Sequence, residues 1–264
     1  MSPKTPPPEE RRGTFDALLE LVETLRGPGG CPWDAEQTHA SLKRNLLEEC
    51  YEVLEAIDQG DPPRLAEELG DILVQVAFHA DIARRAGHFT IADVLRRIND
   101  KLVRRHPHVF GHGTAADARE VERNWERLKA QERGTATGPL EGLPRDLPAL
   151  ALSQAMQDRA ARTGFDWDRV DGVLDKVAEE LAELRAAADP QERAREFGDL
   201  LFALVNAARW LGVHAEDALR QANARFLRRF AQMERLAQER GQEFAALPLE
   251  EKEALWQEAK RTVG

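Results

Sequence analysis

The chain has 264 residues, which is enough for one large domain or for two small domains that each have a hydrophobic core. Its 47 acidic and 37 basic residues give a formal net charge of −10, which argues against a general surface for nucleic acid or for an anionic membrane. No apolar run approaches the roughly 20 residues that span a membrane, and the N-terminal segment lacks the apolar core of a signal peptide. We therefore expect neither nucleic acid nor a membrane as a partner.

The two cysteines, Cys31 and Cys50, do not form a C-x-x-C pair. Two isolated thiols are typical of a reducing compartment, so we expect a cytoplasmic protein. The sequence also lacks a glycine-rich phosphate-binding motif, a nucleophile elbow and a Cys-His pair suited to catalysis. These absences exclude the common nucleophilic enzymes and the P-loop enzymes.

In chain order, the first 13 residues contain four prolines and are expected to form a disordered tail. Apolar periodicity then predicts five helices, near residues 14–26, 38–59, 61–87, 90–105 and around Trp125. Asp61 is a predicted N-cap with Pro62 at the first helical position, and Thr90 with Asp93 resembles a capping box. The GCPWD segment at residues 30–34 is expected to be a loop.

Residues 133–148 contain three glycines and three prolines and form the only convincing linker between domains. We therefore expect one helical domain over residues 14–132 and a second over residues 149–264. In the second domain, helices are predicted near residues 149–162, 170–188, 190–211, 215–240 and 249–262. No stretch shows sustained strand alternation, so the predicted fold class is all-α.

The two halves repeat the same motifs, which indicates a duplicated helical unit. Gly30-x-x-Trp33-Asp34 matches Gly164-x-x-Trp167-Asp168. The second helix of each acidic pair matches at a constant spacing of 128 positions, with Pro62, Glu68 and Asp71 corresponding to Pro190, Glu196 and Asp199. The spacing changes only in connecting segments, as expected for one unit with loops of variable length.

Each half carries four acidic residues on two consecutive predicted helices, namely Glu49, Glu52, Glu68 and Asp71, and Glu180, Glu183, Glu196 and Asp199. Residues three apart share a helix face, so an antiparallel helix pair brings the four carboxylates together. Like charges at about 4 Å repel by about 4 kcal/mol at an effective dielectric near 20, so such a cluster requires a divalent cation. Oxygen ligands alone favour Mg²⁺, with Mn²⁺ as a substitute, over Zn²⁺.

The alternative is that the acids form a solvated surface, as in most charged helices. Two features argue against it. The acids alternate with apolar residues, so these helices have little surface that could form a purely solvent-exposed polar face. Gly70 and Gly198 stand at equivalent positions inside helices, where glycine costs about 1 kcal/mol relative to alanine. Their repetition predicts close backbone approach or space beside the acids.

Cationic and aromatic side chains repeat as well, and some of them are candidates to contact a phosphate or to stack on a base. They are Lys101, Arg104 and Arg105 with Arg225, Arg228 and Arg229, together with Lys43, Arg44, Lys176, Trp33, Trp125, Trp167 and Trp256. For each tryptophan a core position is an equal alternative. His79 is expected to serve in packing, and His106, His108 and His112 to form a structured turn, because neither feature has a counterpart in the second half.

These motifs resemble the MazG family of nucleoside triphosphate pyrophosphohydrolases in its two-domain bacterial form. The similarity runs from about Phe15 to Lys260 and rests on GCPWDAEQTHASL, LLEECYEV, AEELGDIL, INDKLVRRHPHVFG, GFDWD, EELAEL and FGDLLFALVN. It implies two tandem MazG-like helical domains, with helix bundles completed by homodimerisation. It also implies Mg²⁺-dependent hydrolysis of a nucleoside triphosphate to the monophosphate and pyrophosphate, which clears non-standard or excess nucleotides.

Carried over by position, the resemblance assigns metal ligands to the eight acids named above. It gives Glu49 or Glu180 the role of holding or deprotonating the attacking water. Nucleotide contacts fall on Lys176, Asn223, Arg225, Arg229 and Trp256, and in the first half on Asn99, Lys101, Arg105 and Trp125.

Which copy is active is open at this stage. Arg195 stands where the first copy has Glu67, which favours the first copy, whereas the family habit favours the second. A hydrolase restricted to dUTP, dCTP or phosphoribosyl-ATP is one alternative, and a non-enzymatic helical interaction module is another.

Overall fold

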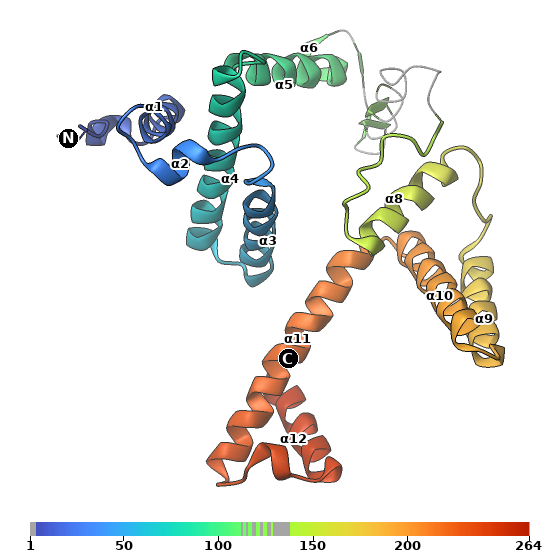
Figure 1. Cartoon of the computed structure of the whole chain (residues 1–264). Helices are drawn as coiled ribbons and strands as arrows, with labels where there is room; N and C mark the ends of the chain where they lie inside the picture. Colours follow the sequence, from blue (N-terminus) through green and yellow to red (C-terminus); the bar gives the residue numbers. More distant parts are fainter. Residues whose placement is uncertain are drawn as a thin grey trace. The chain divides into compact units, whose positions relative to one another are not determined.

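The computed structural model describes residues 4–111, 113–114, 116–117, 120–121, 124–125, 128 and 138–263 (Figure 1). Within these ranges the chain is helical and forms no strand, so the predicted all-α class is confirmed. Among the same residues, no helix combines the length and the apolarity that a membrane crossing requires. The chain divides into two compact units, Met1–Glu132 and Arg133–Gly264, and each is described by itself.

Unit 1 contains the helices α1 (Phe15–Arg26), α2 (Pro32–Glu36), α3 (Lys43–Gln59), α4 (Pro62–Arg85), α5 (Ile91–Arg105) and α6 (Pro107–Phe110), after a 3-10 turn at Glu9–Arg11. Helices α3 and α4 form an antiparallel hairpin, and α1 packs on α4 (Figure 1). The core lies between α1 and α4 and includes Val22, Ala77 and Phe78, with Leu42 from the turn before α3.

Local signals in the sequence locate the start of α4 correctly. The Asp61 side chain accepts a hydrogen bond from the Arg64 backbone N–H, and Pro62 occupies the first turn, where its missing N–H costs nothing. Gly60 ends α3 with a φ of 64°, a left-handed conformation that glycine adopts without strain. The capping box between Thr90 and Asp93 is also present at the start of α5.

Three local predictions need correction. The GCPWD segment is not wholly a loop, because Pro32 starts the short helix α2. Helix α3 begins at Lys43 and not near Thr38, since the side chains of Thr38 and Ser41 each accept a hydrogen bond from the other's backbone N–H and hold a turn. The predicted disordered tail includes the 3-10 turn at Glu9–Arg11, while residues 1–3 lie outside the described part of the chain.

Unit 2 contains α8 (Ala149–Ala161), α9 (Val170–Ala186), α10 (Pro190–Trp210), α11 (Ala215–Glu239) and α12 (Leu249–Thr262), with a 3-10 turn at Phe244–Ala246. These bounds lie within two residues of the predicted helices. Helices α9 and α10 form an antiparallel hairpin, and α8 packs on α10. Helix α11 leads away from them and carries α12 against its far half, and we call this far half and α12 the arm (Figure 1).

Both units leave long apolar helix faces exposed. On α10 these include Phe197 and Leu204, and on α11 they include Phe226 and Leu227. Helix α5 has an apolar face but no buried residue. A globular helix normally covers its apolar face, but the described residues of each unit, taken by itself, leave these faces open.

Candidate functional site

The two helix hairpins bring carboxylates together, as the spacing of the acids predicts. Ligand atoms of Glu49, Glu68 and Asp71 all lie within 4.8 Å of one another, and we call this group the first acidic cluster. Glu180, Glu183 and Glu196 meet the same condition and form the second acidic cluster. Each cluster joins residues from both helices of its hairpin, α3 with α4 and α9 with α10.

Each cluster contains three of the four predicted acids. Glu52 lies outside the first triple, although its charge and a hydrogen bond act on Glu49. Asp199 lies outside the second triple and is exposed, but it lines the pocket beside Glu180. The predicted convergence is therefore formed by three side chains in each unit, with the fourth close by.

Crowding of the carboxylates alters their acidity. Burial, followed by the charges of Asp71 and Glu52, raises the pKa of Glu49. Burial and the charge of Glu180 raise the pKa of Glu183, against the opposing charge of Lys176. A raised carboxyl pKa means that the ionised form is disfavoured where it stands, and a bound cation would remove that penalty.

Basic side chains partly compensate each cluster, and they come from different positions in the two units. Arg64 lies 3.2 Å from Glu68 in the first cluster, and Arg195 lies 2.7 Å from Glu196 in the second. Lys176 adds a second cation at 2.8 Å from Glu180. Hydrogen bonds to Glu179 and Glu180 raise the pKa of Lys176, so this residue stays charged at neutral pH.

The second cluster has the donors that a hard divalent cation requires. Glu180 is only 6% exposed, and its Oε2 atom has no hydrogen-bond partner among the described residues. A buried carboxylate oxygen without a partner is costly unless a ligand satisfies it. Because all donors are carboxylate oxygens, the set fits Mg²⁺ or Mn²⁺ and does not suit a thiolate-preferring metal.

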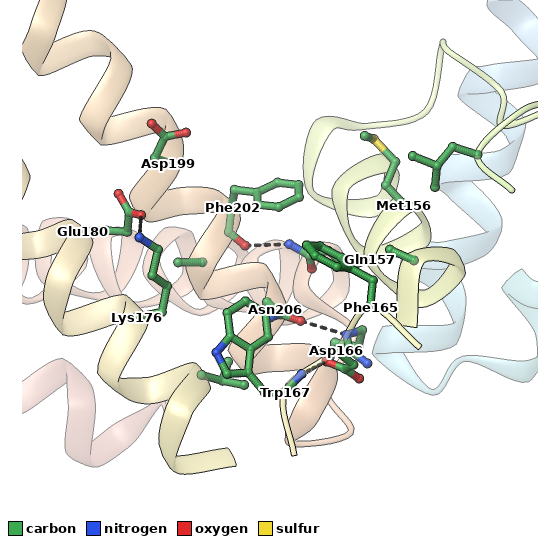
Figure 2. Close-up of a pocket in the computed structure, with 15 residues that line it drawn as sticks. Met156, Gln157, Phe165, Asp166, Trp167, Lys176, Glu180, Asp199, Phe202 and Asn206 are labelled. Atoms are coloured by element: carbon green, nitrogen blue, oxygen red, sulfur yellow. Dashed lines mark hydrogen bonds and ion pairs between the residues drawn. The ribbon is translucent and has the colours of Figure 1, made fainter. Parts of the chain in front are cut away.

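A pocket of about 400 Å³ opens beside the second cluster, between α8, α9 and α10, and we call it the α8–α10 pocket (Figure 2). One end is lined by Lys176, Glu180 and Asp199. The remaining wall is mainly apolar and includes Met156, Phe165, Trp167, Val173, Phe202 and Ala203, with the amides of Gln157 and Asn206. Its volume falls in the range of about 300–1,000 Å³ that is usual for small-molecule sites.

The GFDWD segment forms the outer wall of this pocket. Asp166 accepts hydrogen bonds from Arg209 at 2.5 Å and from the Trp210 ring nitrogen at 3.0 Å, which fixes the loop to α10. The Trp167 ring lies against Gly172, where an added Cβ would stand 2.7 Å from its Cδ1 atom. Glycine at the start of α9 is therefore what admits the tryptophan ring at this position.

The predicted nucleotide contacts of unit 2 do not all meet at the second cluster. Lys176 does, but Asn223, Arg225 and Arg229 lie on α11, and Trp256 lies on α12 in the arm. Arg229 lies over the Trp256 ring, 5.8 Å from its centre. Arg229 and Trp256 therefore meet in the arm, and α11 leads away from α9 and α10 (Figure 1).

Unit 1 shows a parallel arrangement. Arg105 lies over the Trp125 ring at 5.4 Å, and His106 meets the same ring edge-on at 4.8 Å. Asn99 and Lys101 lie exposed on α5. In place of the predicted structured turn, His106 precedes the short helix α6 and His108 lies in it, whereas His112 lies outside the described residues.

The surroundings of His79 and of the two helix glycines can be compared with the predictions for them. His79 lies 2.8 Å from His39 with the rings stacked, and burial followed by the charge of His39 lowers the pKa of His79. The contact supports a packing role. At Gly70 and Gly198 an added Cβ would meet open space among the described residues, which agrees with the predicted space beside the acids and not with a close backbone approach.

Sequence reasoning missed most of the α8–α10 pocket. Of its wall, only Trp167, Lys176 and the acids Glu180 and Asp199 had been singled out. Phe202 and Asn206 lie within the FGDLLFALVN motif, but no role was predicted for either side chain, and Gln157 belongs to no motif. Only the packing of α8 on α10 reveals that they line one cavity.

Comparison with known proteins agrees with this architecture. A family model described as MazG nucleotide pyrophosphohydrolase domain matches residues 37–110, and one described as phosphoribosyl-ATP pyrophosphohydrolase matches residues 150–226. Both matched stretches include the acidic hairpin of their unit. The two copies are thus recognised by separate but related models.

Whole-chain relatives extend the similarity across both units. A Thermotoga maritima protein named nucleoside triphosphate pyrophosphohydrolase/pyrophosphatase MazG is 48% identical over 247 residues, which are 93% of this chain and 95% of that protein. The nucleoside triphosphate pyrophosphohydrolase of Escherichia coli K12 is 46% identical over 255 residues, covering 94% and 97%. The Bacillus subtilis protein YabN is 45% identical over 253 residues, and this chain covers 52% of it.

Proposed function

Since this chain belongs to the MazG family of nucleoside triphosphate pyrophosphohydrolases and is a hydrolase, we propose that its second copy cleaves nucleoside triphosphates to the monophosphate and pyrophosphate with Mg²⁺. The observation that carries this assignment is the α8–α10 pocket, which runs from an aromatic wall to Lys176 and the second acidic cluster. A nucleotide has the same polarity, with a flat apolar base at one end and a charged phosphate chain at the other.

The residues of the acidic end have complementary roles in this proposal. Glu180, Glu183, Glu196 and Asp199 would hold Mg²⁺, which when bound lowers the pKa of water and neutralises phosphate charge. Glu180, with its unpartnered Oε2, is placed to orient or deprotonate the water that attacks the α-phosphorus. Lys176, which stays protonated, stabilises the charge on the phosphates as the pyrophosphate leaves.

We further propose that the active form is a homodimer. The exposed apolar faces of α9, α10 and α11 require a partner surface, and a second copy supplies matching faces. Asn223, Arg225 and Arg229 lie on α11 and Trp256 on α12, and these helices pack mainly on each other and not on the α9–α10 hairpin. Docking α11 and α12 of a second copy over α9 and α10 would add Arg225 and Arg229 to the phosphate end of the pocket.

A narrower hydrolase is the second candidate, because the model that matches residues 150–226 is described as phosphoribosyl-ATP pyrophosphohydrolase. The Thermotoga maritima and Escherichia coli relatives, which align over both units, are named for nucleoside triphosphates, and this supports the broader activity. The family assignment argues against the alternative of a non-enzymatic helical interaction module. Clearance of unwanted nucleotides in the cytoplasm completes the proposal, and the two free cysteines are in keeping with that compartment.

A nucleotide panel tests the proposal. The purified chain is incubated with each ribo- and deoxyribonucleoside triphosphate, with dUTP and with phosphoribosyl-ATP, in Mg²⁺ or in EDTA. We expect pyrophosphate from several triphosphates in Mg²⁺ and none in EDTA. Release of orthophosphate, full turnover in EDTA, or cleavage of phosphoribosyl-ATP alone would each contradict the broad Mg²⁺-dependent activity.

A further inference from the structure

Gln157 has an unusual position in the wall of the α8–α10 pocket. Its Nε2 atom donates a hydrogen bond of 2.8 Å to the backbone carbonyl of Phe202, which links α8 to α10 (Figure 2). A carbonyl can only accept, so the amide orientation is fixed with its oxygen on the other side. That Oε1 atom has no partner among the described residues, although the side chain is only 8% exposed.

Asn206 has the opposite orientation. Its Oδ1 atom accepts a hydrogen bond of 2.9 Å from Arg209, whose guanidinium is held in turn by Asp166. The amide nitrogen of Asn206 is therefore the atom that can donate to a ligand. Two buried amides on different helices thus present an acceptor and a donor to one cavity.

The remaining wall suits a flat ring. Phe165, Trp167 and Phe202 all line the cavity and are substantially exposed, so their ring faces are open to contact. Such faces bind bases by stacking, which tolerates any base. A planar heterocycle with N–H donors and ring acceptors matches both the aromatic faces and the two amides, whereas an aliphatic or peptidic ligand uses only part of this wall.

We infer that Gln157 and Asn206 recognise the nucleobase of the substrate, with the Gln157 carbonyl oxygen accepting a hydrogen bond from an amino group on the base. The inference rests on the proposed function for the direction of the nucleotide, with its phosphates at the second acidic cluster. It makes Gln157 a determinant of base preference. Stacking alone would leave the site indifferent to the base.

The test is a cycle that combines one substitution with one change in the nucleotide. Gln157→Met keeps side-chain length and removes the amide, and purine riboside triphosphate differs from ATP by lacking the 6-amino group. We expect Gln157→Met to lower kcat/KM for ATP about tenfold more than for the purine analogue, because the lost hydrogen bond to Phe202 affects both nucleotides and the lost acceptor affects only ATP. With the unchanged protein, the analogue should already be about tenfold poorer than ATP.

Gln154→Met is the matched control on the same helix. Its amide bonds the Val213 carbonyl and the Ala215 N–H, so both ends are satisfied away from the pocket lining. Any loss from Gln154→Met should be equal for the two nucleotides. An equal loss from Gln157→Met would overturn the inference, as would equal kcat/KM values for ATP and the analogue with the unchanged protein.

Binding separates this inference from the proposed activity. Calorimetric titration with the α,β-methylene forms of ATP and of the purine analogue, in Mg²⁺, repeats the comparison without turnover. If the unchanged protein releases no pyrophosphate from any nucleotide, the proposed function fails, yet the binding cycle still decides whether Gln157 reads the amino group. The comparison of the two nucleotides on the unchanged protein also holds if Gln157→Met does not fold.

Discussion

The two units share an acidic hairpin but differ at the helix face next to it. Positions of α4 and α10 that are 128 apart correspond, so Gln75, Phe78 and Asp81 match Ala203, Asn206 and Arg209. In unit 2 the three residues line the α8–α10 pocket. In unit 1 all three are buried, and Arg26 from α1 lies over the Phe78 ring at 5.7 Å. The acids correspond in position, but Phe78, with Arg26 over its ring, stands in unit 1 where Asn206 lines the pocket in unit 2.

A network of charged side chains holds Arg26 in place. Arg26 bonds Asp81 at 2.9 Å and also reaches the backbone carbonyls of Asp34 and Gln37. Arg84 and Arg85 bind the same Asp81 at 2.8 and 2.6 Å. Displacing Arg26 would break its ion pair with Asp81 and leave two buried charges that no longer compensate each other, which costs free energy. Under the proposed function, the helix face next to the carboxylates, and not the carboxylates alone, would decide which copy binds a nucleoside.

Matched substitutions in the two clusters test this difference most strongly. Glu68 and Glu196 are both 8% exposed, and each is paired with one arginine. We expect Glu196→Gln to lower kcat on the order of 10³-fold, equivalent to about 4 kcal/mol of transition-state stabilisation. Glu68→Gln should remain within about twofold. Pyrophosphate release measures both, and a larger loss from Glu68→Gln would reverse the assignment of the active copy.

Asp81→Asn should destabilise unit 1 by about 3 kcal/mol at pH 7, because it leaves the buried Arg26 unpaired. Burial opposes ionisation of Asp81, but hydrogen bonds from Arg85, Arg84 and Arg26 outweigh it and lower its pKa. A lowered pKa stabilises the fold above the unfolded value of about 3.9, and this contribution is lost as pH falls through the folded pKa.

Denaturant unfolding at pH 7 and below pH 4 measures this prediction. The difference in the free energy of unfolding between the unchanged protein and Asp81→Asn should be smaller below pH 4 than at pH 7. If this difference in the free energy of unfolding stays constant with pH, packing and not the ion pair holds α1 against α4.

Divalent ions should stabilise both units. At about ten times its Kd, Mg²⁺ bound only to the folded state adds about 1.4 kcal/mol for each site. Thermal melts with Mg²⁺ or Mn²⁺ should show a smaller shift in Glu68→Gln and in Glu196→Gln, and none when both are combined. An unchanged shift in the double variant would place the ion elsewhere.

Gly172→Ala should have the smallest effect and act on unit 2 alone. The added methyl group would stand 2.7 Å from the Trp167 ring, which must then move out of the pocket wall. Because the ring is partly exposed, the fold should tolerate the change. We expect KM for ATP to rise about fivefold, equivalent to about 1 kcal/mol, with kcat little altered. An unchanged KM would show that Trp167 does not contact the nucleotide.

Features of the fold that depend on neighbouring residues could be predicted from sequence. The Asp61 cap with Pro62 and the Thr90–Asp93 capping box involve residues a few positions apart, and both are present. Helix α2 was missed because a five-residue helix starting at Pro32 has too few residues for periodicity to show. The shift in the start of α3 also came from a local competitor, the Thr38–Ser41 turn.

The acidic clusters were predictable for a similar reason. Helix spacing and one short turn suffice to bring Glu180, Glu183 and Glu196 together. The α8–α10 pocket was not, because Gln157 and Asn206 are far apart in sequence and meet only through the packing of α8 on α10. Phe78 and Asn206 occupy matched positions of the repeat, and the consequence of this difference depends on Arg26, which comes from another helix.

The second cluster lies on a single helical hairpin, since α9 and α10 are consecutive and antiparallel. Contacts between neighbouring elements close short loops, so they form early and quickly during folding. The carboxylates would then approach one another before the arm or any second copy is in place. Until a cation arrives, their mutual repulsion opposes the closing of the hairpin. The rate of refolding should therefore increase with Mg²⁺ concentration. The hairpin would then bind the ion before the rest of the substrate site has formed.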